Sequence, residues 1–222
     1  MQASVHLYES HQQASLAAAK AIASEIRRLI AERGLAVGIF SGEAALLDQL
    51  AAADAIEWTR VIGFHTFELL GAAEDAPHSQ RKLLFDHLVR QVPMAEFHGL
   101  RGDAANPEAV CVNYSALLKS RPPDVAVLEI GKGWELAAID SANCDFNDRS
   151  AVKLTDSAIT LTIPVLLGCS SLFVTVSSNA SQEAVKAAIT GEVSPNCPAS
   201  ILQTHPNVHL FWERDSPFLF SS

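Results

Sequence analysis

Residues 198–211 read PASILQTHPNVHLF and contain the most informative turn pattern in the chain. Pro206 fixes its own φ angle, and Asn207 tolerates unusual dihedral angles, so the run from His205 to Asn207 predicts a tight turn. The apolar residues 208–212 that follow predict a late strand. We therefore expect His205 to shape the turn that leads into this strand.

Upstream of this segment, strand-like runs alternate with helical patterns. The expected strands are short apolar runs bounded by turn residues: 35–40, 59–67, 96–100, 124–130 and 172–176. The expected helices carry apolar residues at helical spacing: 11–33, 44–53, 79–92, 107–119 and 181–189. This order predicts an α/β domain with a doubly wound, mostly parallel sheet and helices on both faces. We expect strands 35–40, 59–67 and 124–130 to be parallel neighbours.

The length and the composition are those of a single globular domain. The chain has 222 residues, of which 49% are hydrophobic, and no low-complexity linker divides it, so we expect one domain over residues 1–222. The first ten residues lack the pattern of a signal peptide, and no apolar run is long enough to span a membrane. A cytoplasmic protein without a membrane partner is the expectation.

The charge and the cysteines exclude several classes of function. The formal net charge is −9, which disfavours a nucleic-acid partner and also repels anionic ligands at long range. The four cysteines are widely spaced without a CxxC pair, which argues against a structural zinc site and a disulfide scaffold. We expect no metal and no cofactor.

The run P-A-S-x-L-Q-x-H-P-N in residues 198–207 resembles the closing segment of the glucosamine-6-phosphate deaminase (isomerase) and 6-phosphogluconolactonase family. The deaminase branch is the closer match, and the resemblance covers nearly the whole chain. It implies a modified Rossmann-type fold and carbohydrate chemistry. In such sheets ligands bind beyond the carboxyl ends of the strands, so the loops after Phe40, Ile62 and Ile130 are the expected site.

The first of these loops departs from the family pattern. Members resemble G-x-x-T-G-G/S-T-P there, a turn that holds a phosphate at a helix N-terminus. This chain keeps Gly38, Ser41 and Gly42 as candidate ligand-binding residues, but Glu43 follows them. A carboxylate repels a phosphate, although at a helix start it also stabilises the helix dipole. A plain turn with an acidic helix start is the alternative interpretation.

The second loop holds His65 where the resemblance implies the first carboxylate of a D-E-Y run, the base of the deaminases. An imidazole is a competent general base near neutral pH, so His65 is a candidate catalytic residue. The alternative is a histidine that only packs at the end of a strand.

The third loop, residues 129–140, is aligned with the family pattern G-x-G-x-D-G-H-x-A-x-N-E. Gly131 is kept, Lys132 takes a variable place, and both are candidate ligand-binding residues. Gly133 stands for the aspartate, Trp134 for a glycine, Glu135 for the histidine and Asp140 for the final glutamate. We expect Glu135 as an acid and Asp140 as a residue that orients the others, with His65, Glu135 and Asp140 in one cleft.

Two cationic phosphate contacts of the family are replaced. Ser181 stands where the resemblance implies a lysine, and it is the last candidate ligand-binding residue. An expected arginine falls in a shortened stretch, which leaves Arg149 and Lys153 as stand-ins. Ordinary hexosamine 6-phosphates are therefore expected to bind weakly.

Two functions remain open at this point. One is a sugar-phosphate isomerase/deaminase or lactonase-like enzyme of carbohydrate metabolism with changed catalytic residues and an altered substrate. The other is a non-catalytic module that binds a sugar or sugar phosphate on the same fold. The expected partner is a small sugar or sugar-phosphate ligand, and a homo-oligomer is left open.

Overall fold

The computed structural model describes residues 4–177, 180 and 182–213. Its centre is a seven-stranded sheet in the order β1-β10-β9-β6-β2-β3-β5, and every neighbouring pair runs parallel. The strands of this sheet are β1 (Ser4–Tyr8), β2 (Ala36–Phe40), β3 (Val61–His65), β5 (Glu96–His98), β6 (Val125–Ile130), β9 (Ser171–Val176) and β10 (Val208–Glu213). The central sheet confirms the expected fold class, and β6, β2 and β3 are the parallel neighbours that the sequence predicts.

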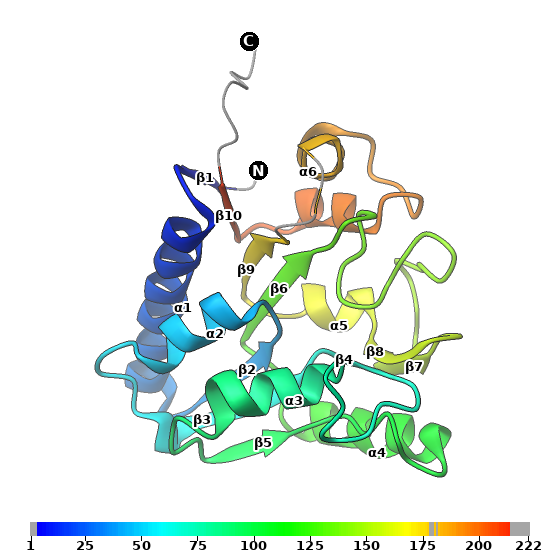
Figure 1. Ribbon diagram of the computed structural model, residues 1–222, viewed down its shortest axis with the longest axis horizontal. Helices are drawn as coiled ribbons and strands as arrows, with labels where there is room; N and C mark the ends of the chain where they lie inside the picture. The colour runs from blue at the N-terminus through cyan, green and yellow to red at the C-terminus, as the bar shows by residue number, and fades with distance from the viewer. Residues whose placement is uncertain (1–3, 178–179, 181, 214–222) are drawn as a thin grey trace.

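Helices cover both faces of the sheet, as Figure 1 shows. One face carries α1 (His11–Arg33), α2 (Ala44–Ala51) and α3 (Gln80–Leu84), which continues as a π-helical turn, η2 (Phe85–Val89). The other face carries α4 (Pro107–Ser120), α5 (Ile163–Leu167), α6 (Gln182–Thr190) and a 3-10 helix, η3 (Pro198–Thr204). None of the helices in the described residues is long and apolar enough to cross a membrane.

Successive side chains of each strand enter the two cores alternately. On β6, Val125 and Val127 pack with the α1 and α2 core, whereas Ala126 and Leu128 pack with the opposite core. All four are fully buried, which is why this strand reads as a continuous apolar run. The alternation fixes the side of the sheet on which the next residue, Glu129, must lie.

The sequence signals for helix ends hold where the structure describes them. The Ser10 side chain accepts a hydrogen bond from the Gln13 amide, and Gly34 ends α1 with a left-handed φ of 78°. Ser79 caps α3 through the amide of Lys82, and Pro107 is in the first turn of α4. These local caps explain the accurate helix boundaries.

A second, three-stranded antiparallel sheet was not expected from the sequence. It consists of β4 (Phe67–Leu69), β8 (Ala158–Leu161) and β7 (Val152–Leu154). The single strand expected over 59–67 is wrong in this respect: it is a 3-10 turn, η1 (Trp58–Arg60), then β3, then β4 in the other sheet. The chain leaves the main sheet at Thr66, whose hydroxyl donates to the Phe40 carbonyl.

Candidate active site

A pocket of about 180 Å³ opens beyond the carboxyl ends of β2 and β6. It exceeds the ~150 Å³ cavity that holds a benzene molecule, so it has room for a small ring. The residues that line it come from five segments of the chain: Ser41, Gly42, Phe67, Gln80, Glu129, Gly131, Glu135 and Ala137. None of these eight described residues has a basic side chain, and two of them are glutamates.

The first wall of the pocket is the turn between β2 and α2. Ser41 donates from both its amide and its hydroxyl to the Val127 carbonyl of β6, which ties the turn to the neighbouring strand. Gly38, inside β2, lies deeper: a Cβ there would come within 2.6 Å of the Phe40 ring. Gly38 therefore makes room for a core aromatic ring, while Gly42 reaches the pocket.

Glu129 is the most perturbed carboxyl group of the site. It follows Val125 and Val127 on the same side of β6, at the end of the strand, where it is half-buried. Burial, together with the charges of Glu43 and Glu135, raises the pKa of Glu129 to about 7. A carboxyl group with such a pKa can both give and accept a proton near neutral pH.

Glu135 is held in a tight loop that follows β6. The Gly131 amide donates to the Glu135 backbone carbonyl at 3.0 Å, and the Gly133 amide donates to the carboxylate at 2.6 Å. A Cβ on Gly131 would come within 2.0 Å of the Glu135 carboxylate, so only glycine lets this side chain fold back. The loop therefore places a second carboxylate at the pocket beside Glu129.

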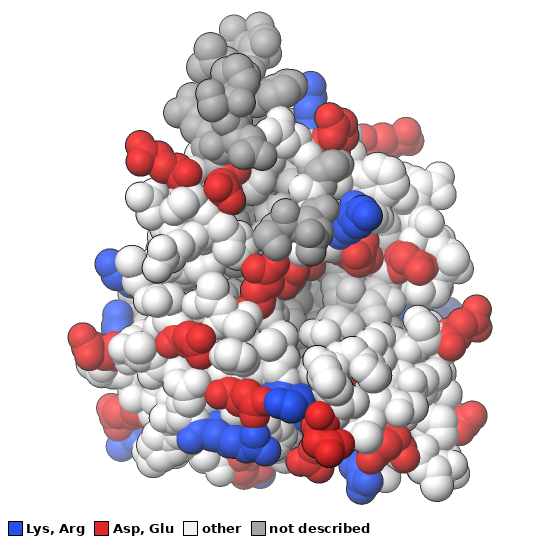
Figure 2. Space-filling model, viewed as in Figure 1, with Lys and Arg blue, Asp and Glu red and all other residues white. Residues whose placement is uncertain are grey.

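A third carboxylate stands at the start of α2. Glu43 is the N-cap residue of that helix, and its carboxylate lies 2.8 Å from the Nε2 atom of His11 and 3.4 Å from the Ser177 hydroxyl. Figure 2 shows acidic side chains gathered near the middle of this face of the molecule. The described residues contain no group of three or more His, Cys, Asp or Glu side chains placed to hold a metal ion.

Comparison with known proteins agrees with this architecture. Residues 9–212 match the family described as glucosamine-6-phosphate isomerases/6-phosphogluconolactonase. The chain belongs to this family.

Curated relatives and solved structures carry the same two names. The chain is 24% identical over 211 residues to a glucosamine-6-phosphate deaminase of Streptococcus pneumoniae serotype 4, which covers 86% of this chain and 90% of the relative. It is 26% identical over 208 residues to a glucosamine-6-phosphate deaminase of Exiguobacterium sibiricum, covering 85% of this chain and 82% of the relative.

The structural neighbours include both branches of the family. A monomeric glucosamine-6-phosphate deaminase superposes with a TM-score of 0.83 at 21% identity, covering 95% of this chain and 97% of the other. A 6-phosphogluconolactonase from Shewanella baltica OS155 superposes with a TM-score of 0.83 at 18% identity, covering 96% and 98%. At these identities the superpositions establish the fold, while the curated sequences support the deaminase branch.

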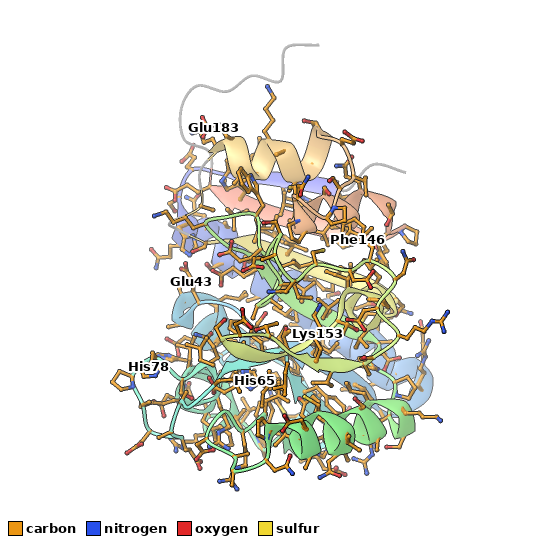
Figure 3. All side chains as sticks on the ribbon, turned by 90° about the vertical axis from the view of Figure 1, so that its right-hand side faces the viewer. Glu43, His65, His78, Phe146, Lys153 and Glu183 are labelled. Atoms are coloured by element: carbon orange, nitrogen blue, oxygen red, sulfur yellow. The ribbon has the colours of Figure 1, made fainter. Side chains whose placement is uncertain are left out.

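The family position expected to hold the base is occupied here by a buried histidine. His65 is only 1% exposed, and neither of its ring nitrogens has a hydrogen-bond partner among the described residues. Burial, with a smaller effect of Arg81, lowers the pKa of His65 to about 3. The residues that line the pocket do not include it; Figure 3 labels His65 below Glu43 in the view.

Asp140 and Lys132 also lie outside the pocket lining. The Asp140 carboxylate accepts hydrogen bonds from the amides of Ala142 and Asn143 and from the Asn143 side chain, so it stabilises a turn on the surface. Lys132 is exposed in the loop beside Gly131. Of the three residues expected to share a cleft, the structure brings Glu135 alone into this pocket.

The cationic stand-ins for the phosphate contacts do not reach the pocket lining. The Lys153 ammonium group donates to the Asn143 carbonyl and lies 3.4 Å from the Asp148 carboxylate, and Arg149 is exposed. Ser181 lies outside the described residues. Among the candidate ligand-binding residues, Ser41, Gly42 and Gly131 line the pocket.

Two features of the site were missed in the sequence. Glu129 is the single charged residue of an otherwise apolar strand, VAVLEI, and that contrast was the signal that could have found it. Gln80 lines the pocket at the start of α3, where the buried Glu68 carboxylate accepts from the amides of Gln80 and Arg81 and from the Ser79 hydroxyl. Glu68 lies eleven to thirteen positions before the residues that it binds, so no local sequence pattern could predict that Gln80 reaches the pocket.

Proposed function

We propose that this member of the family carries out acid–base chemistry on an unphosphorylated sugar, with an amino sugar preferred. The observation that supports the proposal is the pocket itself, whose described lining contains Glu129 and Glu135 and no basic side chain. A neutral sugar presents hydroxyl groups that donate to carboxylates, and an ammonium group adds a charge-assisted bond. A phosphate would instead be repelled by the same groups.

Glu129 is the proposed proton-transfer residue. Its pKa of about 7 suits proton transfer at neutral pH in either direction, which ring opening and isomerisation of a sugar require. Glu135 is the proposed second carboxyl group, in keeping with the acid role expected from the sequence. The pocket residues Ser41 and Gln80 add polar groups that can orient hydroxyls.

His65 has no step in this proposal. A base with a pKa of about 3 holds a proton too weakly to abstract one from carbon at neutral pH, and no described contact connects it to the pocket. Asp140 acts only through the turn that it stabilises.

A non-catalytic sugar-binding module is the second candidate. Its support is the hydrogen bond from the Gly133 amide to the Glu135 carboxylate, which gives that side chain a structural role in its loop. In this case the same pocket binds the sugar without turnover.

Calorimetry and a turnover assay with D-glucosamine test both candidates. We expect D-glucosamine to bind the wild-type chain, and Glu129→Gln to remove turnover because the amide cannot transfer a proton. Lys119→Ala, on the exposed surface of α4, is the matched control and should behave as wild type. Binding with no turnover in the wild type selects the binding module, and no binding of D-glucosamine refutes the proposed ligand class.

A further inference from the structure

Two glutamates from different elements meet at one serine. Glu129 of β6 is paired with Thr175 in the parallel register with β9, and the Ser177 amide continues this ladder by donating to the Ile130 carbonyl. Ser177, two positions after Thr175, therefore follows on the side of the sheet where Glu129 lies. The Ser177 hydroxyl donates to the Glu43 carboxylate at 3.4 Å, and the same side chain is hydrogen-bonded to Glu129. It thus connects a carboxyl group of the pocket with one outside the pocket lining.

A serine hydroxyl has only one proton, which limits how it can serve two carboxyl groups. It donates to one of them and can only accept from the other. With Ser177 donating to Glu43, an ionised Glu129 would face an oxygen lone pair, whereas a protonated Glu129 donates to that lone pair. The chain of hydrogen bonds is complete when the pair of carboxyl groups holds one proton, on Glu129.

The surroundings of the two carboxyl groups favour the same distribution of charge. Glu43 is at the N-terminus of α2, where the helix dipole favours a negative charge, and its carboxylate lies 2.8 Å from the Nε2 atom of His11. Desolvation acts most strongly on Glu129, and the side chains that act on it are two glutamates and Ser177, with no cation among them. The negative charge is therefore more stable on Glu43 and the proton on Glu129.

His11, the first residue of α1, acts on Glu43 by its charge. The two groups form an ion pair when the ring is protonated, but the Nε2 atom has no aligned hydrogen-bond partner among the described residues. The His11 side chain is 26% exposed and that of Glu43 is 31% exposed. Replacing His11 therefore removes a positive charge from this partly exposed pair without removing a hydrogen bond that the described residues show.

We propose that Glu43 and Glu129 share one proton across the Ser177 hydroxyl. In this arrangement His11 is a positioning residue: its charge keeps Glu43 ionised and so leaves the proton on Glu129. The inference rests on the proposed function for the use of this proton, because Glu129 then enters the reaction as the acid. When Glu129 has given its proton to the substrate, the Ser177 hydroxyl turns to donate to the new carboxylate.

Infrared spectroscopy can follow this proton without a ligand, because a protonated carboxyl group and a carboxylate absorb at different frequencies. Each chain is compared with the same chain carrying Glu129→Gln, so that the difference isolates the titration of the pair. Recorded from about pH 5 to about pH 9, above the range in which ordinary carboxyl groups titrate, the wild type should show a midpoint near 7. The charged groups that surround the pair in the described residues are His11 of α1 and Glu135 of the loop after β6.

Variants of the two ion-pair partners should shift this midpoint in opposite directions. Glu43→Gln removes a negative charge beside Glu129 and should lower the midpoint by about one pH unit. His11→Ala removes the charge that keeps Glu43 ionised, so the pair should hold its proton to a higher pH. Ser177→Ala removes a donor to the ionised form of Glu129 and should also raise the midpoint.

Glu108→Gln, at an exposed position on α4, is the matched control and should leave the midpoint unchanged. A purely structural ion pair between His11 and Glu43 would leave it unchanged in both of their variants. An unchanged midpoint in Glu43→Gln, or a lowered one in His11→Ala, overturns the inference.

The result for the wild type separates this inference from the proposed function. A wild type without any titration near neutral pH overturns both the shared proton and the proton-transfer role proposed for Glu129. Because the infrared measurement uses no ligand, a wild type that shows the expected shifts but does not bind D-glucosamine supports the shared proton and refutes the proposed function.

Discussion

The C-terminal segment 198–207 and the loops around the pocket use similar polar side chains in opposite ways. In the segment, the His205 ring is satisfied on both sides: Nε2 donates to the Cys169 carbonyl, and Nδ1 accepts from the Asn207 amide. At the end of β3, His65 is also buried, and neither of its ring nitrogens is hydrogen-bonded among the described residues. His205 stabilises a turn, as the sequence predicted, whereas His65 has buried ring nitrogens without a hydrogen-bond partner among the described residues.

The same contrast extends to the neighbours of each histidine. The Gln203 side chain donates to the carbonyls of Ala188 and Gly191, and Asn207 donates to the Ser171 hydroxyl. The pocket loops instead hold a carboxyl group with a raised pKa and a tryptophan, Trp134, with a left-handed φ of 65°.

This difference distinguishes the segment that identifies the family from the loops that we expect to determine the function. The segment that carries the resemblance joins α6, β9 and the start of β10 through these hydrogen bonds. The loops around the pocket contain the perturbed groups, which is where we expect function. The segment that carries the family resemblance and the residues that line the pocket thus lie in different parts of this sequence.

The largest effect on stability is expected for His65, whose buried ring nitrogens have no hydrogen-bond partner among the described residues. Since the pKa of His65 is about 3 in the folded chain and 6.5 when unfolded, stability is full above pH 6.5 and falls as pH decreases toward 3. At about 1.4 kcal/mol per pH unit, this one group accounts for roughly 5 kcal/mol. Urea unfolding of wild type and His65→Leu across this range should give a shallower slope for the variant, and equal slopes would contradict the buried neutral ring.

Glu129 should show the opposite dependence on pH. Its pKa is raised from 4.5 to about 7, so its contribution to stability is present below pH 4.5 and is lost as pH rises through 7. Glu129→Gln should therefore unfold with up to about 3 kcal/mol more free energy than wild type at pH 8, and with little difference at pH 4.5. A variant less stable than wild type at pH 8 would make Glu129 a structural residue.

Replacing His205, whose ring is hydrogen-bonded on both sides, should have a smaller effect on stability, and this effect should not depend on a ligand. His205→Ala leaves the buried Cys169 carbonyl without its donor, at a cost of about 2 kcal/mol in the free energy of unfolding. His78→Ala, at an exposed position, is the control and should change stability by less than about 0.5 kcal/mol. A loss of D-glucosamine affinity beyond that explained by unfolding would place His205 in the site instead.

The sequence predicted the elements that have local signals. The helix caps at Ser10, Gly34 and Ser79 and the apolar runs of β2 and β6 were sufficient to place the central sheet. The small sheet escaped because β4 pairs with β8 about ninety positions later in the chain, and strands of three or four residues carry no periodic pattern.

The site was only partly predictable for a similar reason. The loops after β2 and β6 were expected at the site because parallel strands end at one edge, and residues of both loops line the pocket. Which side chain reaches the pocket depended on burial and strand alternation: His65 is enclosed, whereas Glu129 emerges. Ungapped alignment with a family pattern assigns positions to roles but does not show which way their side chains face.

The most direct test of the account compares D-glucosamine with glucosamine 6-phosphate on the wild-type chain by calorimetry, at low and at high salt. We expect the phosphorylated sugar to bind at least about tenfold more weakly at low salt, because the carboxylates repel it, and we expect high salt to reduce this difference in affinity. Tighter binding of glucosamine 6-phosphate at low salt would contradict the account and show that the acidic pocket does not select the ligand.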